Sequence, residues 1–198
     1  MKKYNVAVVG ATGLVGRTFL KVLAEYNFPI NNLVLYASAR SAGKVVEFMG
    51  KEYTIVELTH DAFDDIDIAL FSAGGGVSKE YAPIAANKGA IVIDNSSAWR
   101  MDENCALIVP EINLEDAYSK SNIIANPNCS TIQSVLPLKP LLDKFGLKRV
   151  VYTTYQSVSG SGKQGIDDLL RCRKGTRYRI FNFRKYKKLQ EFSSYRSS

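Results

Sequence analysis

The sequence predicts an α/β fold, a doubly wound parallel sheet whose strands alternate with helices. Short apolar runs of strand length recur in the first 125 residues, and each ends in small or polar residues. These runs are "YNVAVVG", "NLVLYAS", "DIALFSA", "AIVIDNS" and "NIIANP". Because helical patterns separate some of them, we expect parallel strands with helices on both faces of the sheet.

The remaining elements follow in order. Residues 14–26 and "VSKEYAPIAANKG" have helical spacing of apolar residues, and the stretch from "GKVVEFMG" to "YTIVEL" predicts a short inserted hairpin. After residue 129, "STIQSVLPLKPLLDKFG" predicts an apolar helix kinked at Pro137 and Pro140. A long strand, "KRVVYTTYQSV", a loop, "SGSGKQG", and a helix start at "IDDLL" complete the pattern.

Three segments of different character are expected. Residues 1–125 form a cofactor domain, and residues 126–170 begin an incomplete α/β catalytic domain. Residues 171–198 hold ten of the 26 Lys and Arg residues but one of the 19 Asp and Glu residues. This basic tail fits neither a helical nor a strand period and resembles the product of a frameshift or premature stop. A nucleic-acid-binding arm and a neutral solvated tail are the alternatives.

Composition excludes several protein classes. No apolar run is long enough to span a bilayer, and the first residues do not resemble a signal peptide, so we expect a cytoplasmic protein. Cys105, Cys129 and Cys172 are too widely spaced for a disulfide framework or a metal site. The acidic residues between positions 61 and 67 lack the spacing of a calcium loop and are expected at a solvated helix start.

A glycine loop joins the first strand to the first helix. In "GATGLVG", Gly10, Gly13 and Gly16 permit a tight turn and let backbone N–H groups approach a pyrophosphate at the positive end of the helix. The loop therefore predicts dinucleotide binding on a Rossmann-type fold, although the spacing differs from the commoner G-x-G-x-x-G pattern. A purely structural turn is the alternative.

The end of the second strand indicates which dinucleotide binds. NAD enzymes usually carry an acidic residue there to hold the ribose 2′-hydroxyl, whereas this chain has Ser38, Arg40 and Ser41. A guanidinium and two hydroxyls suit a 2′-phosphate, so NADP is the expected cofactor. The alternative is a solvated basic loop.

One cysteine has the setting of a nucleophile. In "NPNCSTIQ", Cys129 follows an Asn-Pro-Asn turn at the first turn of a predicted helix, where the helix N-terminus stabilises a thiolate. Free cysteines are more often buried in cores. The polar neighbours Asn126, Asn128, Ser130 and Thr131 argue against burial of Cys129.

Seven motifs together resemble those of one enzyme family. "GATGLVG", "SARSAGK", "FSAGGGVSKEYAP", "VIDNSSAWRMD", "VPEIN", "NPNCSTIQ" and "YQSVSGSGKQG" are similar, in order and spacing, to those of aspartate-β-semialdehyde dehydrogenase. The resemblance covers residues 4 to about 170. It implies NADPH-dependent reduction of 4-aspartyl phosphate to L-aspartate 4-semialdehyde, on the route to diaminopimelate, lysine, threonine and methionine.

The resemblance also implies roles for individual residues. Cys129 would form the acyl thioester, Gln156 and Asn128 would bind the substrate, and Arg100 would hold the phosphate. Residues implied or expected to bind NADP are Gly10, Thr12, Gly13, Leu14, Val15, Ser38, Arg40, Ser41, Ser159 and Gly160. No metal is expected, and the partners are small molecules and further copies of the chain, since the family forms dimers or tetramers.

The sequence also departs from the family. The second half of the family enzyme supplies a histidine base, an arginine for the substrate carboxylate, a lysine in the phosphate site and much of the dimer interface, and none can be placed here. His60 is expected on a surface turn. We therefore expect weak activity or none. The alternatives are N-acetyl-glutamyl-phosphate reductase, a non-catalytic NADP-binding remnant and a basic-tailed nucleic-acid binder.

Overall fold

The computed structural model describes residues 2–118 and 120–173 of the chain. The chain divides into two units, residues 1–156 and residues 157–198. The first unit contains the sheet, and the described part of the second consists of short helical segments. Among the described residues, no helix has both the length and the apolar character needed to cross a membrane.

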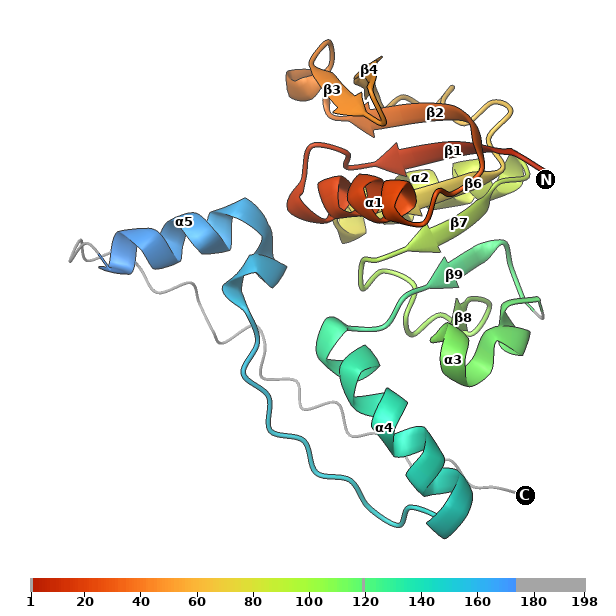
Figure 1. The fold of residues 1–198 in the computed structure, drawn as a ribbon, viewed down its shortest axis with the longest axis vertical. Coiled ribbons are helices and arrows are strands. Elements are labelled where there is room, and N and C mark those ends of the chain that lie inside the picture. The colour runs from red at the N-terminus through yellow and green to blue at the C-terminus, as the bar shows by residue number, and fades with distance from the viewer. Residues whose placement is uncertain (1, 119, 174–198) are drawn as a thin grey trace. The chain divides into compact units, whose positions relative to one another are not determined.

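A parallel sheet of seven strands forms the centre of the first unit (Figure 1). Its strand order is β5-β2-β1-β6-β7-β9-β8, and each neighbouring pair is parallel. The strands are β1 (Tyr4–Val9), β2 (Ile30–Ala37), β5 (Val56–Glu57), β6 (Ile68–Phe71), β7 (Ile91–Asp94), β8 (Ala106–Leu107) and β9 (Ile123–Ala125). The predicted α/β class with a parallel, Rossmann-type sheet is confirmed.

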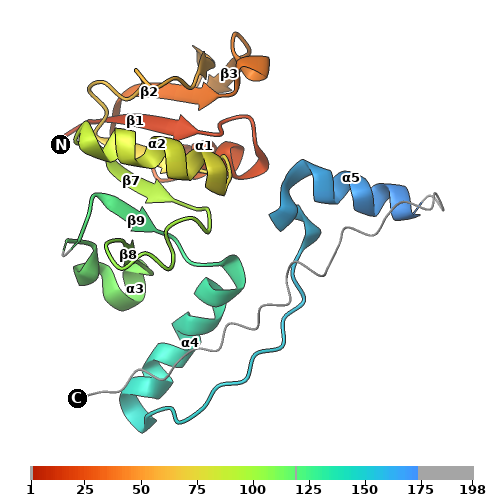
Figure 2. The same ribbon diagram turned by 180° about the vertical axis from the view of Figure 1, so that it is seen from behind.

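Two helices cover opposite faces of the sheet. Helix α1 (Leu14–Glu25) lies in front of it in Figure 1, and α2 (Gly75–Asn87) lies in front of it in the reversed view of Figure 2. Side chains alternate along β1, so Val6 and Val8 join the core that includes Leu20 of α1, whereas Ala7 and Val9 join the core that includes Ala82 of α2. The helical spacing of apolar residues in the sequence corresponds to the faces of α1 and α2 that pack on the sheet.

The predicted hairpin insert is present. Strands β3 (Val45–Phe48) and β4 (Lys51–Thr54) pair antiparallel as a separate two-stranded sheet. A short 3₁₀ helix, η1 (Ala39–Ser41), connects β2 to this hairpin, and α3 (Pro110–Asn113) and η2 (Leu114–Tyr118) lie between β8 and β9. The acidic stretch at 61–67 forms turns before β6, so the helix start expected there is wrong.

After the sheet, the predicted helix is confirmed, but the strand expected to follow it is not. Helix α4 (Cys129–Phe145) continues through Pro137 and Pro140 as one helix, and none of its residues is buried. Residues 149–157 form neither helix nor strand, so the expected long strand at "KRVVYTTYQSV" is wrong. A β-strand needs a neighbour to hydrogen-bond, and the described chain offers none to this segment.

The second unit is described from Ser157 to Arg173. It contains η3 (Val158–Ser161) and α5 (Gly162–Arg173), so the segment expected to be the loop "SGSGKQG" is largely helical. Helix α5 includes the first residues of the predicted basic tail. The rest of that tail, residues 174–198, lies outside the described residues.

We expect Gly16 to be essential for packing α1 onto β1. A Cβ atom at Gly16 would lie 2.3 Å from the Gly10 carbonyl oxygen, a backbone atom that cannot move aside cheaply. Gly16→Ala should therefore lower the free energy of unfolding by about 2 kcal/mol or more. The matched control is Gly76→Ala in the first turn of α2, where a Cβ meets nothing within 4 Å. Thermal melts should show a lower melting temperature for Gly16→Ala but not for Gly76→Ala. Equal melting temperatures for the two variants would contradict this account.

Candidate active site

The candidate site lies at the carboxyl edge of the sheet in the first unit. The loops that follow β1, β2, β7 and β9 carry most of the predicted site residues. Because parallel strands present their carboxyl ends at one edge, these loops are brought to the same side of the sheet although they are far apart in sequence.

The glycine loop lies beside the carboxyl ends of β1 and β6. Gly10 adopts φ +89, and its N–H donates to the Tyr36 carbonyl at 2.9 Å. A Cβ at Gly10 would lie 2.6 Å from the Ser72 carbonyl oxygen at the end of β6, so only glycine fits this close approach. The strand order reverses between β1 and β6: the chain first builds the sheet outward from β1 through β2, and then in the other direction from β6. Open α/β sheets bind ligands at such a point of reversal.

The start of α1 leaves its backbone donors available. Its N-cap is Gly13, which has no side chain to accept from the first N–H groups, and no acidic residue stands in the first turn. Thr12 and Val15 are half-buried, and Leu14 is exposed. This end of the helix can accept an anion such as a pyrophosphate.

The residues expected to select NADP lie after β2, in and beside η1. Ser38 and Arg40 are exposed, whereas Ser41 is buried. In the part of the chain that the structure describes, the Arg40 guanidinium makes no ion pair or side-chain hydrogen bond. Arg40 is therefore free to pair with a ligand phosphate.

Cys129 is the first residue of α4 and is exposed. Its neighbour Asn128 caps the helix: the Asn128 Oδ1 atom accepts from the Ser130 N–H at 3.0 Å. The same oxygen accepts from Gln156 Nε2 at 3.1 Å. The structure thus brings together Cys129, Asn128 and Gln156, three residues predicted for substrate chemistry.

Arg100 connects the loops after β7 and β9. Its Nε atom donates to the Asn126 carbonyl at 2.9 Å, and its Nη2 atom donates to the Asn95 carbonyl at 3.2 Å. Burial lowers the pKa of Arg100 from its ordinary value, while the charges of Asp94 and Cys129 act in the opposite direction. The guanidinium is thus held against the carbonyl of Asn126, three residues before Cys129 in the chain.

Cys105 lacks this setting. Cys105 is buried, with its Sγ atom 3.6 Å from the Ser121 Oγ atom, and burial raises the pKa of its thiol. Cys172 belongs to α5, and its side chain lies outside the described ones. Of Cys105 and Cys129, only Cys129 is exposed.

Two of the residues predicted to bind the cofactor lie in the second unit. Ser159 and Gly160 belong to the second unit, where the Ser157 and Ser159 hydroxyls lie 2.7 Å apart. Their role in cofactor binding stays a prediction.

Sequence reasoning gave no role to Asp94 or Asn95. Asp94 is fully buried, and Asn95 contacts Arg100 and Asn126. Their signal was present in "VIDNSSAWRMD", where polar residues directly follow a buried strand.

The fold and the glycine loop define a dinucleotide-binding protein of the Rossmann class. Two family models match the sequence: "Semialdehyde dehydrogenase, NAD binding domain" over residues 5–120, and "Semialdehyde dehydrogenase, dimerisation domain" over residues 138–193. The chain belongs to the semialdehyde dehydrogenase family and corresponds to the N-terminal region of aspartate-semialdehyde dehydrogenases. The second match extends beyond residue 170, where the family motifs read from the sequence end.

Curated relatives are similar over most of this chain. The aspartate-semialdehyde dehydrogenase of Aquifex aeolicus is 64% identical over 169 residues, which cover 84% of this chain and 50% of the relative. That of Bacillus subtilis is 53% identical over 165 residues, covering 83% of this chain and 48% of the relative. The chain therefore spans about half the length of the curated relatives it matches.

Solved structures agree with the fold. Aspartate semialdehyde dehydrogenase II from Vibrio cholerae, in a complex described as containing ASA, is 47% identical with a TM-score of 0.84, covering 91% of this chain and 55% of that one. The Candida albicans aspartate semialdehyde dehydrogenase, solved with NADP, is 28% identical with a TM-score of 0.63, covering 73% of this chain and 48% of that one.

Proposed function

We propose that this chain carries the cofactor site and the nucleophile for NADPH-dependent reduction of 4-aspartyl phosphate to L-aspartate 4-semialdehyde. The observation that carries the proposal is the exposed Cys129 at the start of α4, with Asn128 and Gln156 hydrogen-bonded to each other and Arg100 bonded to the carbonyl of Asn126, three residues before Cys129. A nucleophile, an anion-binding cation and substrate-binding amides are the groups that acyl-phosphate chemistry requires. Acylation of Cys129 by 4-aspartyl phosphate is the direct test.

The residues present fit a phosphorylated dinucleotide. The close approach at Gly10 and the uncapped start of α1 suit a pyrophosphate, held by the loop from Gly10 to Val15. Arg40, with Ser38 and Ser41, would bind the 2′-phosphate. When bound, NADPH would supply the hydride for the reduction.

The chemistry of Cys129 follows from its position. As a thiolate, its Sγ atom would attack the carbonyl carbon of the acyl phosphate, forming a C–S bond as the bond to the phosphate oxygen breaks. Phosphate would leave with the electron pair, and the Arg100 guanidinium would pair with its charge. After hydride reaches the thioester carbon, the C–S bond would break, releasing the aldehyde and restoring the thiolate.

Asn128 and Gln156 would orient the substrate during these steps. The Asn128 Oδ1 atom is occupied by the Ser130 N–H and by Gln156 Nε2, which leaves the Asn128 Nδ2 donor and the Gln156 Oε1 acceptor for a ligand. Both amides stand beside the nucleophile, where fixed hydrogen bonds would align the acyl group with Sγ.

We also propose the domain organisation behind this function: residues 1–125 for the cofactor, and the start of a catalytic domain over 126–170. The match to the dimerisation-domain model supports assembly into a homodimer or larger oligomer. The related N-acetyl-glutamyl-phosphate reductase activity would use the same kind of cysteine, but the relatives matched favour the aspartate substrate.

Cofactor choice gives a prediction at Arg40. We expect NADPH to bind more tightly than NADH, and Arg40→Ala to narrow the difference by about 1.5 to 3 kcal/mol, the contribution of hydrogen bonds to a charged group. Lys51→Ala, which removes a positive charge from β4, is the matched control and should leave the difference unchanged. Titration of each variant with NADPH and with NADH measures the difference in binding free energy. Equal affinity for NADPH and NADH in the unmodified chain would defeat the assignment.

A further inference from the structure

Two asparagines face each other where β7 and β9 end. Asp94 and Ala125 are the last paired residues of these strands, so Asn95 and Asn126 come next on each. The Asn126 N–H donates to the Asp94 carbonyl at 2.8 Å, and the Asn126 Nδ2 atom donates to Asn95 Oδ1 at 2.6 Å. This amide pair ties together two loops that are 31 residues apart in sequence.

Arg100 depends on the spacing of those two loops. Its Nε and Nη2 atoms donate to the carbonyl oxygens of Asn126 and Asn95 respectively. A guanidinium is a rigid planar fork, so it can reach both carbonyls only if they stay at a fixed separation. Among the residues that the structure describes, the Nη1 donors have no hydrogen-bond partner, so they remain for a ligand.

The rest of the loop is anchored separately. The Ser96 hydroxyl donates to the buried Asp94 Oδ2 at 2.6 Å and accepts from the Ala98 N–H at 3.1 Å. The Trp99 Nε1 atom donates to the Ser78 Oγ atom of α2 at 2.8 Å. These bonds fix the path of the chain up to Arg100, and the two carbonyls fix the guanidinium itself.

We propose that Asn95 and Asn126 are positioning residues: their side-chain amide pair sets the separation of the carbonyls that Arg100 bridges and so holds the guanidinium beside Cys129. The proposal rests on the proposed function in one respect, because it is there that Arg100 binds the departing phosphate. The positioning itself can be measured without turnover.

The experiment compares two alkylating agents, one anionic and one neutral, at Cys129. Iodoacetate is an anion and iodoacetamide is neutral. The rate constant for iodoacetate divided by that for iodoacetamide therefore rises with positive charge near the thiol. Peptide-resolved mass spectrometry of the full chain gives this ratio for Cys129 separately from the other cysteines. We expect Arg100→Ala to lower the ratio roughly fivefold, since a nearby charge is removed.

The asparagine variants then test positioning. Asn95→Ala and Asn126→Ala should each lower the ratio at least about twofold, and the double variant should fall no further than either single one, because the two act as one unit. The matched control is Asn31→Ala: Asn31 Nδ2 donates to Asn5 Oδ1 at 2.9 Å, an amide pair of the same kind at the other end of neighbouring strands. Asn31→Ala should leave the ratio unchanged. If an alanine variant fails to fold, Asn95→Ser and Asn126→Ser replace it.

Two results would overturn the proposal: a wild-type ratio in both asparagine variants while Arg100→Ala lowers it, or no effect of Arg100→Ala. Protection of Cys129 from iodoacetamide by inorganic phosphate is measured in parallel. Absence of protection in the unmodified chain would count against the proposed phosphate role of Arg100. The charge ratio would still decide whether the amide pair positions the guanidinium.

Discussion

The purified chain is expected to oxidise aspartate semialdehyde, in the presence of NADP and phosphate, below ordinary detection. General acid–base catalysis typically contributes about 10² to 10⁴ in rate, and correct positioning of the substrate contributes further. The chain contains one histidine, His60, so any histidine base supplied by this polypeptide must be that residue.

His60 is badly placed for this role. It follows β5, the strand at one edge of the sheet, whereas Cys129 follows β9 near the other edge. Its Nε2 atom lies 3.1 Å from the Glu80 carboxylate, and its ring lies against that of Tyr81 with centroids 5.1 Å apart. A general base must come within hydrogen-bond reach of the proton that it removes, and His60 is engaged elsewhere.

The assay needs two controls. The Aquifex aeolicus relative, which is about twice as long as the matched region, serves as the active reference. The Cys129→Ala variant shows whether any residual rate depends on the proposed nucleophile. Robust turnover that this substitution abolishes would show that the chain, alone or as an oligomer, is a complete enzyme.

A second prediction, of self-association, concerns the surface of α4 and of the segment that follows it. Large apolar side chains are exposed along this region, which we call the α4 apolar surface: Leu136, Leu141, Leu142, Phe145, Leu147, Val150, Val151, Tyr152 and Tyr155. Tyr155 is 98% exposed and α4 buries none of its residues. Extended apolar surface of this kind drives association, so we expect the isolated chain to bind a hydrophobic dye strongly and to self-associate as its concentration rises.

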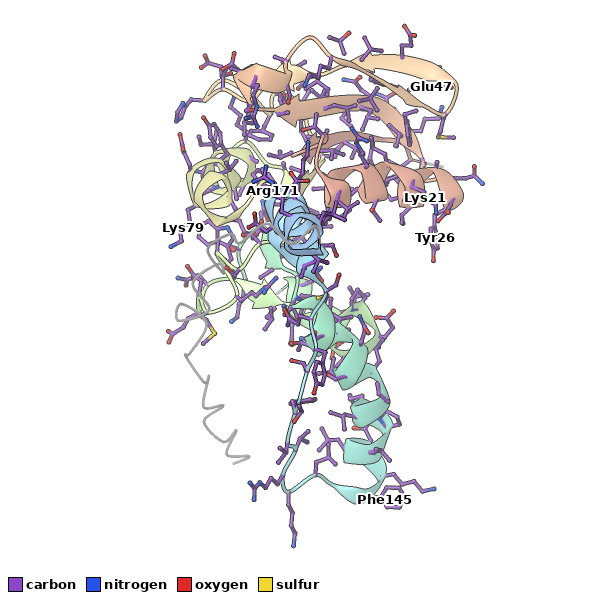
Figure 3. The ribbon with its side chains drawn as sticks, turned by 90° about the vertical axis from the view of Figure 1, so that its left-hand side faces the viewer. Lys21, Tyr26, Glu47, Lys79, Phe145 and Arg171 are labelled. Carbon is purple, nitrogen blue, oxygen red and sulfur yellow. The ribbon has the colours of Figure 1, made fainter. Side chains whose placement is uncertain are left out.

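A pair of lysine substitutions tests where the association occurs. Phe145, at the end of α4, is 71% exposed, and Tyr26, beyond the end of α1, is 80% exposed (Figure 3). Phe145→Lys should reduce self-association in analytical ultracentrifugation, because it places a charge within the α4 apolar surface. Tyr26→Lys changes a similarly exposed aromatic residue outside the α4 apolar surface and should have little effect. A monomeric, highly soluble chain with a cooperative melt would contradict the prediction.

The sequence predicted best those features that depend on neighbouring residues. The turn from Gly10 to Gly13 and the capped start of α4 can be recognised from short patterns because each is closed by a local bond: the Gly13 N–H donates to the Gly10 carbonyl, and the Ser130 N–H donates to Asn128 Oδ1. The support of Arg100 could not be recognised in this way. It depends on Asn126, which lies 26 residues away and is brought close only by the pairing of β7 with β9.

The wrong prediction at residues 148–158 has the same origin. The alternation in "KRVVYTTYQSV" is typical of a strand, but a strand forms only when another strand accepts and donates its hydrogen bonds. The described chain provides no such partner, and the segment is exposed. The local sequence pattern therefore indicated a preference for strand, but no strand forms at residues 148–158.

The central claim is that Cys129 is the residue acylated by the substrate, and it can be tested without turnover. In the proposed mechanism, acylation would use the Cys129 thiolate, an anion site at Arg100 and the amides of Asn128 and Gln156, all of which lie within the first unit. Incubation with 4-aspartyl phosphate in the absence of NADPH, followed by mass spectrometry of the peptides, should therefore reveal a hydroxylamine-labile adduct on Cys129. The adduct should be weaker in Arg100→Ala and absent from Cys129→Ala. A folded chain that binds NADPH but acquires no adduct on Cys129, or acquires it on Cys105 instead, would contradict the account.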